Sequence, residues 1–140
     1  MISRPDSFVV FSLDGSLFAL PSAEVVEVSK AGEVQTFPHN SAQLEGVILH
    51  RGSLLPVWDL AGKIGAAAAL PKKFCLMARR NFAAAEPTAI PVSTEGQMLR
   101  SEMLPPAEGA PAHVCGVLMI DGRQVEVLDL ERLGMERVRP

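Results

Sequence analysis

The chain repeats itself with a shift of 70 positions, and this duplication constrains its fold more than any local motif. Gly46-Val47-Ile48-Leu49 falls on Gly116-Val117-Leu118-Met119, and Ala19-Leu20-Pro21 falls on Ala89-Ile90-Pro91. A match that recurs at a fixed spacing indicates a structural unit used twice. The chain of 140 residues is therefore expected to contain two similar units.

Each unit is predicted to consist of short strands. β-branched and aromatic runs are separated by Gly, Pro and Asp-Gly turn signals. Ser22 to Val28 predicts one helical turn and then a strand, because a residue type that caps helices precedes valines that prefer extended backbone. The other strand candidates are Phe8 to Leu13, Leu17 to Leu20, Gly46 to Leu49, Leu54 to Trp58, Phe74 to Ala78, Thr88 to Val92, Met98 to Leu104, Val114 to Ile120 and Gln124 to Leu128.

About five short strands per unit suit a small barrel, since closing a sheet removes its exposed edges. A unit of this size is marginal alone, so the two units are expected to share an apolar interface. The sequence predicts an all-β fold of two small five-stranded barrels packed together in a single domain of residues 1–140.

Composition and charge exclude several classes of protein. A net charge of -3 argues against a nucleic-acid partner, because such proteins concentrate Lys and Arg on one face. The sequence has no signal-peptide pattern and no apolar run long enough to span a bilayer, so a cytoplasmic protein without membrane insertion is expected. Cys75 and Cys115 lie in apolar stretches, which predicts two reduced thiols in the core.

Catalysis has its strongest candidates in Asp59 and Asp129, which occupy equivalent places in the two halves. Paired aspartates from a duplicated all-β unit suggest a coupled-aspartate hydrolase. Each aspartate is followed by Leu, however, where aspartic proteases have Thr or Ser and then Gly. We expect both residues to cap short helical turns. Cys115 is not expected to act as a nucleophile, because alternate residues of a strand such as His113 and Cys115 do not reach hydrogen-bond distance.

No metal site or cofactor is expected. His39, His50, His113, Cys75 and Cys115 include no closely spaced pair of the kind that structural zinc sites use. The glycines are scattered at turns and form no phosphate-binding loop.

Two further groups of residues admit a plain structural interpretation. Arg51 lies in a turn between apolar strands, where an arginine is ordinarily solvated. Val25, Glu27 and Val28 fit a strand with one buried and one solvated face, and simple alternation places the two valines on opposite sides.

The order of these motifs resembles the CheW-like domain. The resemblance covers about Phe8 to Gly134 and is most specific from Gly46 to Leu60, with Gly46, Arg51-Gly52, Pro56-Val57 and Asp59-Leu60 in the family's places. Earlier matching segments are Phe8 to Leu13, Phe18 to Pro21 and Val25 to Val28. The resemblance implies two intertwined SH3-like five-stranded barrels around a shared hydrophobic core. The expected subdomains are 8–13 plus 80–140 and 14–79, the exchange of strands between them being left open.

The resemblance also implies a function. Members are non-enzymatic adaptors that couple chemoreceptor tips to the regulatory domain of the histidine kinase CheA, and they use no cofactor. Val25, Glu27, Val28, Gly46 and Arg51 match positions implicated in a receptor-facing groove between the barrels. Because the chain begins with Met1, a free-standing adaptor is expected rather than part of a kinase.

Two departures from the family qualify the partners. His50 stands where members more often carry a neutral apolar or polar residue, and two alternatives are open: it adds a pH-sensitive contact, or it has no role. Pro91 interrupts a strand that usually carries a Val-Asp pair, and a proline there predicts an edge strand or a bulge. A scaffold redirected to a pilus, gliding or other pathway is therefore the alternative, and a small-barrel nucleic-acid binder is opposed by the low aromatic content and acidic charge.

Overall fold

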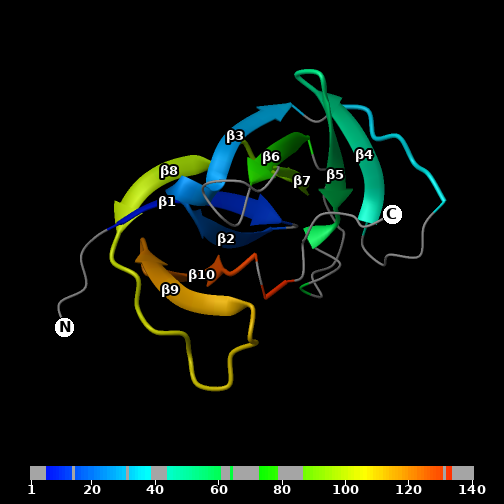
Figure 1. Ribbon diagram of the computed structural model, residues 1–140. Coiled ribbons are helices and arrows are strands. Elements are labelled where there is room, and N and C mark those ends of the chain that lie inside the picture. Colours follow the sequence, from blue (N-terminus) through cyan, green and yellow to red (C-terminus); the bar gives the residue numbers. More distant parts are fainter. Residues whose placement is uncertain are drawn as a thin grey trace.

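The structure is a computed structural model, and it describes residues 6–13, 15–30, 32–38, 44–60, 64, 73–78, 87–130 and 132–133. These residues form ten strands and one short 3-10 turn, η1 (Figure 1). The bounds are β1 Asp6–Leu13, β2 Ser16–Pro21, η1 Ser22–Glu24, β3 Val25–Lys30, β4 Leu44–His50, β5 Ser53–Trp58, β6 Phe74–Ala78, β7 Thr88–Val92, β8 Gln97–Ser101, β9 Val114–Ile120 and β10 Arg123–Leu128.

The strands form two five-stranded sheets, which confirms the predicted all-β class. Sheet A has the order β8-β1-β2-β10-β9, and sheet B has the order β3-β6-β7-β5-β4. The two sheets lie side by side in Figure 1, with β9 and β10 of sheet A in orange and β4 and β5 of sheet B in green-blue. The turn followed by a strand that was expected at Ser22 to Val28 is present as η1 and β3.

The two halves of the sequence exchange strands between the sheets. Each sheet takes the first two strands of one half and the last three strands of the other. Strands of different halves pair in the antiparallel ladders β1–β8 and β3–β6 and in two parallel contacts, Val127 with Ala19 and Val57 with Ala89. The two parallel contacts are equivalent under the shift of 70 positions, so the same junction is made twice. Duplication has therefore produced two sheets that each need both halves of the chain.

Sheet membership differs from the predicted subdomain ranges at two strands. β2 belongs with β1 in sheet A, although its residues fall within 14–79, and β7 belongs with β6 in sheet B, although its residues fall within 80–140. The reason is local, because β1 and β2 form an antiparallel hairpin, as do β6 and β7. Each of these pairs is antiparallel along its length and so keeps both of its strands in one sheet.

The expectation that Pro91 marks an edge strand or a bulge is wrong, and β7 pairs with β6 without a break in register. β7 lies inside sheet B, between β6 and β5. Its parallel ladder with β5 is confined to the pair Val57 and Ala89, so the N–H that Pro91 lacks falls beyond that ladder. Pro21 ends β2 at the equivalent place in the other half. The proline is therefore a feature of the repeat.

The core has three parts. The largest joins the sheets and contains Phe11 and Leu20 of sheet A beside Leu76 and Ile90 of sheet B. A second cluster lies within sheet A and a third within sheet B. Successive residues of the central strands alternate between the shared core and the core of their own sheet, as extended backbone requires. The shared apolar interface expected from the small size of each unit is present.

Two local expectations need correction. The strand predicted from Met98 to Leu104 ends at Ser101, and Leu104 instead forms a separate bridge with Val117 of β9. Cys75 is buried as expected, but Cys115 is only partly buried. Cys115 is the extra residue of a bulge, since its neighbours on either side pair with consecutive residues of β10.

Candidate functional site

The site is built on the tight turn between β4 and β5. Arg51 has a φ of 49° and Gly52 a φ of 81°, so both central residues of the turn are left-handed. This combination gives a type I′ hairpin, whose twist matches that of the flanking strands. The conformation is uncommon for a residue with a Cβ, and it projects Arg51 away from the sheet with 78% of its side chain exposed.

Glu27 of β3 meets this turn from the opposite edge of sheet B. Its Oε1 atom lies 2.5 Å from Nε2 of His50 and 3.2 Å from Nε of Arg51, and its Oε2 atom accepts from Nη2 of Arg51 at 3.3 Å. In a flat five-stranded sheet the two edges would lie about 19 Å apart. Contact between β3 and β4 side chains therefore shows that sheet B curls until its edges meet.

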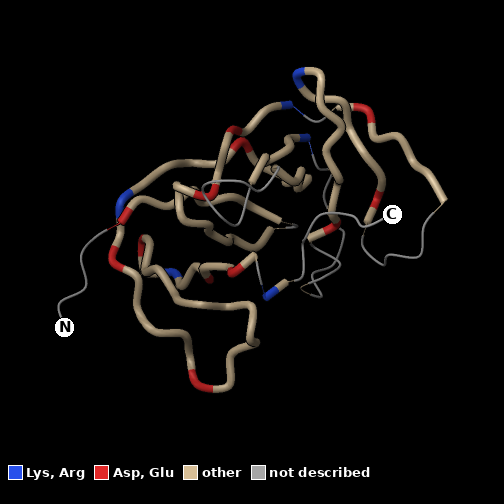
Figure 2. The backbone as a smooth tube through the Cα atoms, in the orientation of Figure 1, with Lys and Arg blue, Asp and Glu red and all other residues tan. Residues whose placement is uncertain are grey.

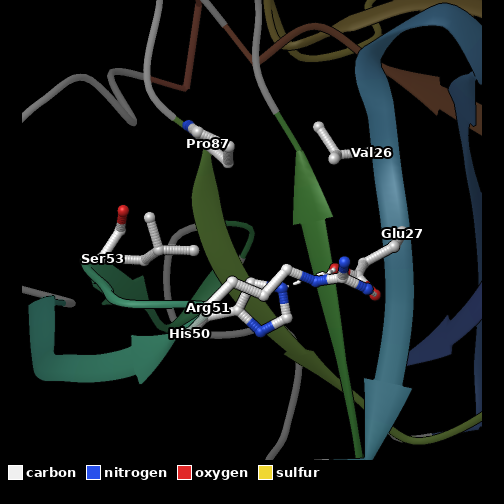
Figure 3. Close-up of a pocket in the computed structure, with 7 residues that line it drawn as sticks. Val26, Glu27, His50, Arg51, Ser53 and Pro87 are labelled. Carbon is white, nitrogen blue, oxygen red and sulfur yellow. Dashed lines mark hydrogen bonds and ion pairs between the residues drawn. The ribbon is translucent and has the colours of Figure 1, made fainter.

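We call the place where side chains of β3 and of the β4–β5 turn meet the seam of sheet B. A pocket of about 380 Å³ opens at this seam. Figure 3 shows His50 and Arg51 reaching from the turn toward Glu27, with Pro87 and Val26 on the far side of the opening. Leu55 supplies a buried apolar surface, whereas Val26 is 45% exposed. The pocket thus combines apolar walls with one ion pair at its rim, which suits the binding of an amphipathic protein segment.

The electrostatics favour an ionised Glu27. The hydrogen bond from His50 is the main cause that lowers the pKa of this carboxyl group, and Arg51 adds a hydrogen bond and its positive charge. Partial desolvation opposes this shift without cancelling it. The carboxylate is therefore a stable acceptor that holds the two donors of the turn.

Val25 and Val28 do not lie on opposite sides of the strand, as simple alternation predicts. β3 pairs Val25 with Ala78 and Glu27 with Met77, which leaves Val26 as the extra residue of a bulge. The bulge turns Val25 and Val28 to the same side, where both pack against the core shared by the two sheets. It also presents Val26 and Glu27 to the pocket.

Close packing of the backbone explains why position 46 is a glycine. It is buried in β4, and a Cβ placed there would lie 2.2 Å from the backbone oxygen of Gln35. Gln35 and Val47 exchange two backbone hydrogen bonds of 2.8 and 2.9 Å across this glycine. The structure thus brings Glu27 and Arg51 together, but it places Gly46 beneath a crossing segment and Val25 and Val28 against the core.

Sequence reasoning missed four lining residues, Val26, Ser53, Leu55 and Pro87, and left the role of His50 open. No local motif marks them, because the pocket forms only where distant edges of sheet B meet. Alternation of hydrophobic residues could have found Val26 only if the bulge had been recognised.

The charged and metal-ligating residues elsewhere in the described part of the chain are the candidates for a second site. Figure 2 shows positions of Lys and Arg interspersed with positions of Asp and Glu along the described backbone. Among the residues described, no three His, Cys, Asp or Glu side chains gather as metal ligands, and His39 lies outside this part. No helix in it is long and apolar enough to cross a membrane.

Glu24 is an unusual carboxyl group at the crossing between the sheets. It ends η1, which carries the chain from β2 of sheet A to β3 of sheet B. Burial raises its pKa to about 7, and the negative charge of Asp129 acts in the same direction. The folded chain therefore favours the neutral form of Glu24.

This shift predicts a dependence of stability on pH. Because folding raises the pKa of Glu24, protonation of this carboxyl group stabilises the folded chain. This contribution to stability is complete below the ordinary glutamate range and is lost as pH rises toward 7. Glu24→Gln should remove this part of the loss, so urea unfolding at pH 5 and pH 8 should differ less in the variant than in the native chain. Glu95→Gln, an exposed change at the second crossing, is the control. Equal pH dependence in all three proteins would contradict the assignment.

Asp129 behaves as a cap. Its Oδ1 atom accepts the backbone N–H of Arg132 at 3.4 Å, three residues along the chain. Its own N–H donates to the carbonyl of His113 at 2.8 Å, and Leu130 behind it is buried. These contacts fix the turn after β10 and fit the structural interpretation of the aspartate.

Removing this cap should reduce stability. We expect Asp129→Ala to lower the free energy of unfolding by about 0.5–2 kcal/mol, because an N–H at the start of the turn loses its acceptor. Urea unfolding measures the change, with Asp6→Ala, an exposed aspartate at the start of β1, as the control. A loss no larger than that of the control would contradict the capping role.

Comparisons with known proteins agree with this architecture. The model of the CheW-like domain family matches residues 7–82. Protein FrzA from Myxococcus xanthus is 29% identical over 139 residues, which cover 94% of this chain and 87% of that protein. The crystal structure of the scaffolding protein TtCheW from Thermoanaerobacter tengcongensis is similar with a TM-score of 0.83 at 23% identity, covering 96% of this chain and 99% of that one. The structural likeness shows a shared fold.

Proposed function

The chain belongs to the CheW-like domain family, and from this we propose that it is a non-enzymatic cytoplasmic adaptor of chemosensory signalling. It would couple the cytoplasmic tip of a chemoreceptor to the regulatory domain of the histidine kinase CheA. We further propose that residues 1–140 act as a single domain, because each sheet needs strands from both halves.

The observation that carries the proposal is the ion pair at the seam of sheet B. Glu27 holds Arg51 through Nε and Nη2, and within the described residues no contact holds Nη1. A guanidinium fixed on one side and exposed on the other is prepared to bind a carboxylate or carbonyl of a partner, since less side-chain freedom is lost on binding.

The apolar walls supply the second part of the mechanism. An amphipathic helix from the receptor tip would place an apolar side chain between Val26, Leu55 and Pro87, while Arg51 fixes its register. Val25 and Val28 would support this surface from the shared core, and Gly46 would shape β4 beneath it. The kinase domain would bind a different surface.

Calorimetric titration tests the proposal. The full chain is titrated separately with the cytoplasmic tip of the cognate receptor and with the regulatory domain of the cognate CheA. Binding of both supports the adaptor function. A folded chain that binds neither would overturn it.

One observation favours the alternative partner. His50, which departs from the family's usual residue, contacts Glu27 inside the site. A redirected scaffold of a pilus, gliding or other pathway would bind a different cytoplasmic protein through the same pocket, and it would bind that protein in preference to the chemoreceptor tip.

A further inference from the structure

The Glu27 carboxylate is shared by two donors that approach from different sides. His50, the last residue of β4, is 23% exposed and approaches from the sheet, whereas Arg51 is 78% exposed and approaches from the solvent. Oε1 is common to both contacts, at 2.5 Å from His50 and 3.2 Å from Arg51. The histidine is therefore the inner of the two contacts.

The contact of His50 with Glu27 affects the ion pair that Glu27 forms with Arg51. An exposed arginine paired with a mobile carboxylate gains little, because two flexible side chains must be ordered at once. A carboxylate already held by a second donor presents a fixed acceptor, and only the arginine remains to be ordered. Preorganisation of this kind improves binding without adding a contact to the partner.

We propose that His50 is a positioning residue, which donates from Nε2 to Glu27 and so fixes the carboxylate that aims Arg51 at the partner. The donor must be an Nε2–H, because an ionised carboxylate only accepts hydrogen bonds. Among the described residues, the charged or titratable groups that face Glu27 are His50 and Arg51, both from the β4–β5 hairpin. The alignment of Arg51 thus depends on a side chain that acts through Glu27.

Titration of the Glu27 carboxyl group by NMR tests the hydrogen bond in the full chain, without any partner. The native chain should show a lowered pKa for Glu27, and His50→Phe should raise it, because the ring keeps its bulk and loses the donor. His50→Gln should restore part of the lowering through its amide N–H, and His113→Phe should change nothing. A native Glu27 titration in His50→Phe, or no restoration in His50→Gln, would overturn the proposal.

A double-mutant cycle tests the consequence, and only this arm rests on the proposed function. His50→Phe should weaken binding of the receptor tip by about threefold to tenfold in the native background. In an Arg51→Ala background the same change should have little further effect, since there is no guanidinium left to aim. Additive losses would overturn positioning through Arg51. Absence of all binding by the native chain would instead count against the proposed function, and the NMR result would still stand.

Discussion

Replacing Arg51 with alanine is expected to weaken binding of the receptor tip by about tenfold to a hundredfold, which matches the loss of a charged hydrogen bond at a binding site. The fold should be unaffected, because the Arg51 side chain is mostly exposed and makes its described contacts with Glu27 alone. Alanine should not stabilise the turn, since the left-handed backbone at position 51 is disfavoured for alanine as it is for arginine. The effect should therefore be confined to binding.

Calorimetry of the native chain and two arginine variants measures this. Arg123→Ala is the matched control, because Arg123 is also exposed and follows Gly122 in the equivalent hairpin of the second half. The control should bind the receptor tip as the native chain does, and both variants should bind the kinase domain normally. Equal weakening by both variants would show that the seam of sheet B is not the receptor site.

Gly46→Ala should destabilise the chain by about 3–5 kcal/mol, the largest stability effect that we expect. Gly46 has a φ of 152°, which residues with a Cβ rarely adopt, and the new methyl group would lie 2.2 Å from the Gln35 carbonyl oxygen. That oxygen is held by a hydrogen bond from Val47, so the obstacle is backbone and does not move easily. The substitution therefore causes both backbone strain at position 46 and steric overlap with Gln35.

The duplication supplies a matched comparison for this glycine. Gly116 occupies the equivalent place in β9, but a methyl group added there would first meet the flexible side chain of Met103, at 2.4 and 2.5 Å. Gly116→Ala should therefore cost less, about 1–3 kcal/mol. Gly52→Ala, with a φ of 81° and open space around it, should cost about 1 kcal/mol from backbone strain alone. Urea unfolding measures all three, and equal losses at Gly46 and Gly52 would contradict the close approach.

The repeat of 70 residues, together with the local patterns of hydrophobic and turn residues, was sufficient to predict two units built of strands. These features were not sufficient to predict which strands share a sheet. The junctions of Val57 with Ala89 and of Ala19 with Val127 are long-range and parallel, and no short motif encodes them. The same limit applied to Pro91, which is tolerated in an interior strand because the ladder between β7 and β5 is confined to one pair.

The candidate site was predictable in part. The resemblance pointed to Glu27 and Arg51, and the structure places their side chains in contact. It could not reveal the bulge at Val26, which turns both valines toward the shared core, because a single extra residue leaves the sequence pattern of β3 intact. Nor could it reveal the contact of His50 with Glu27, which depends on the curling of sheet B.

The central claim is that one chain holds two partners at once, and a three-component titration tests it most directly. The receptor tip is titrated by calorimetry into the native chain alone and into the chain saturated with the CheA regulatory domain. The adaptor function predicts the same receptor affinity in both titrations, with the kinase domain retained in a ternary complex. Loss of receptor binding when the kinase domain is present, or no binding of either partner by the folded chain, would contradict it.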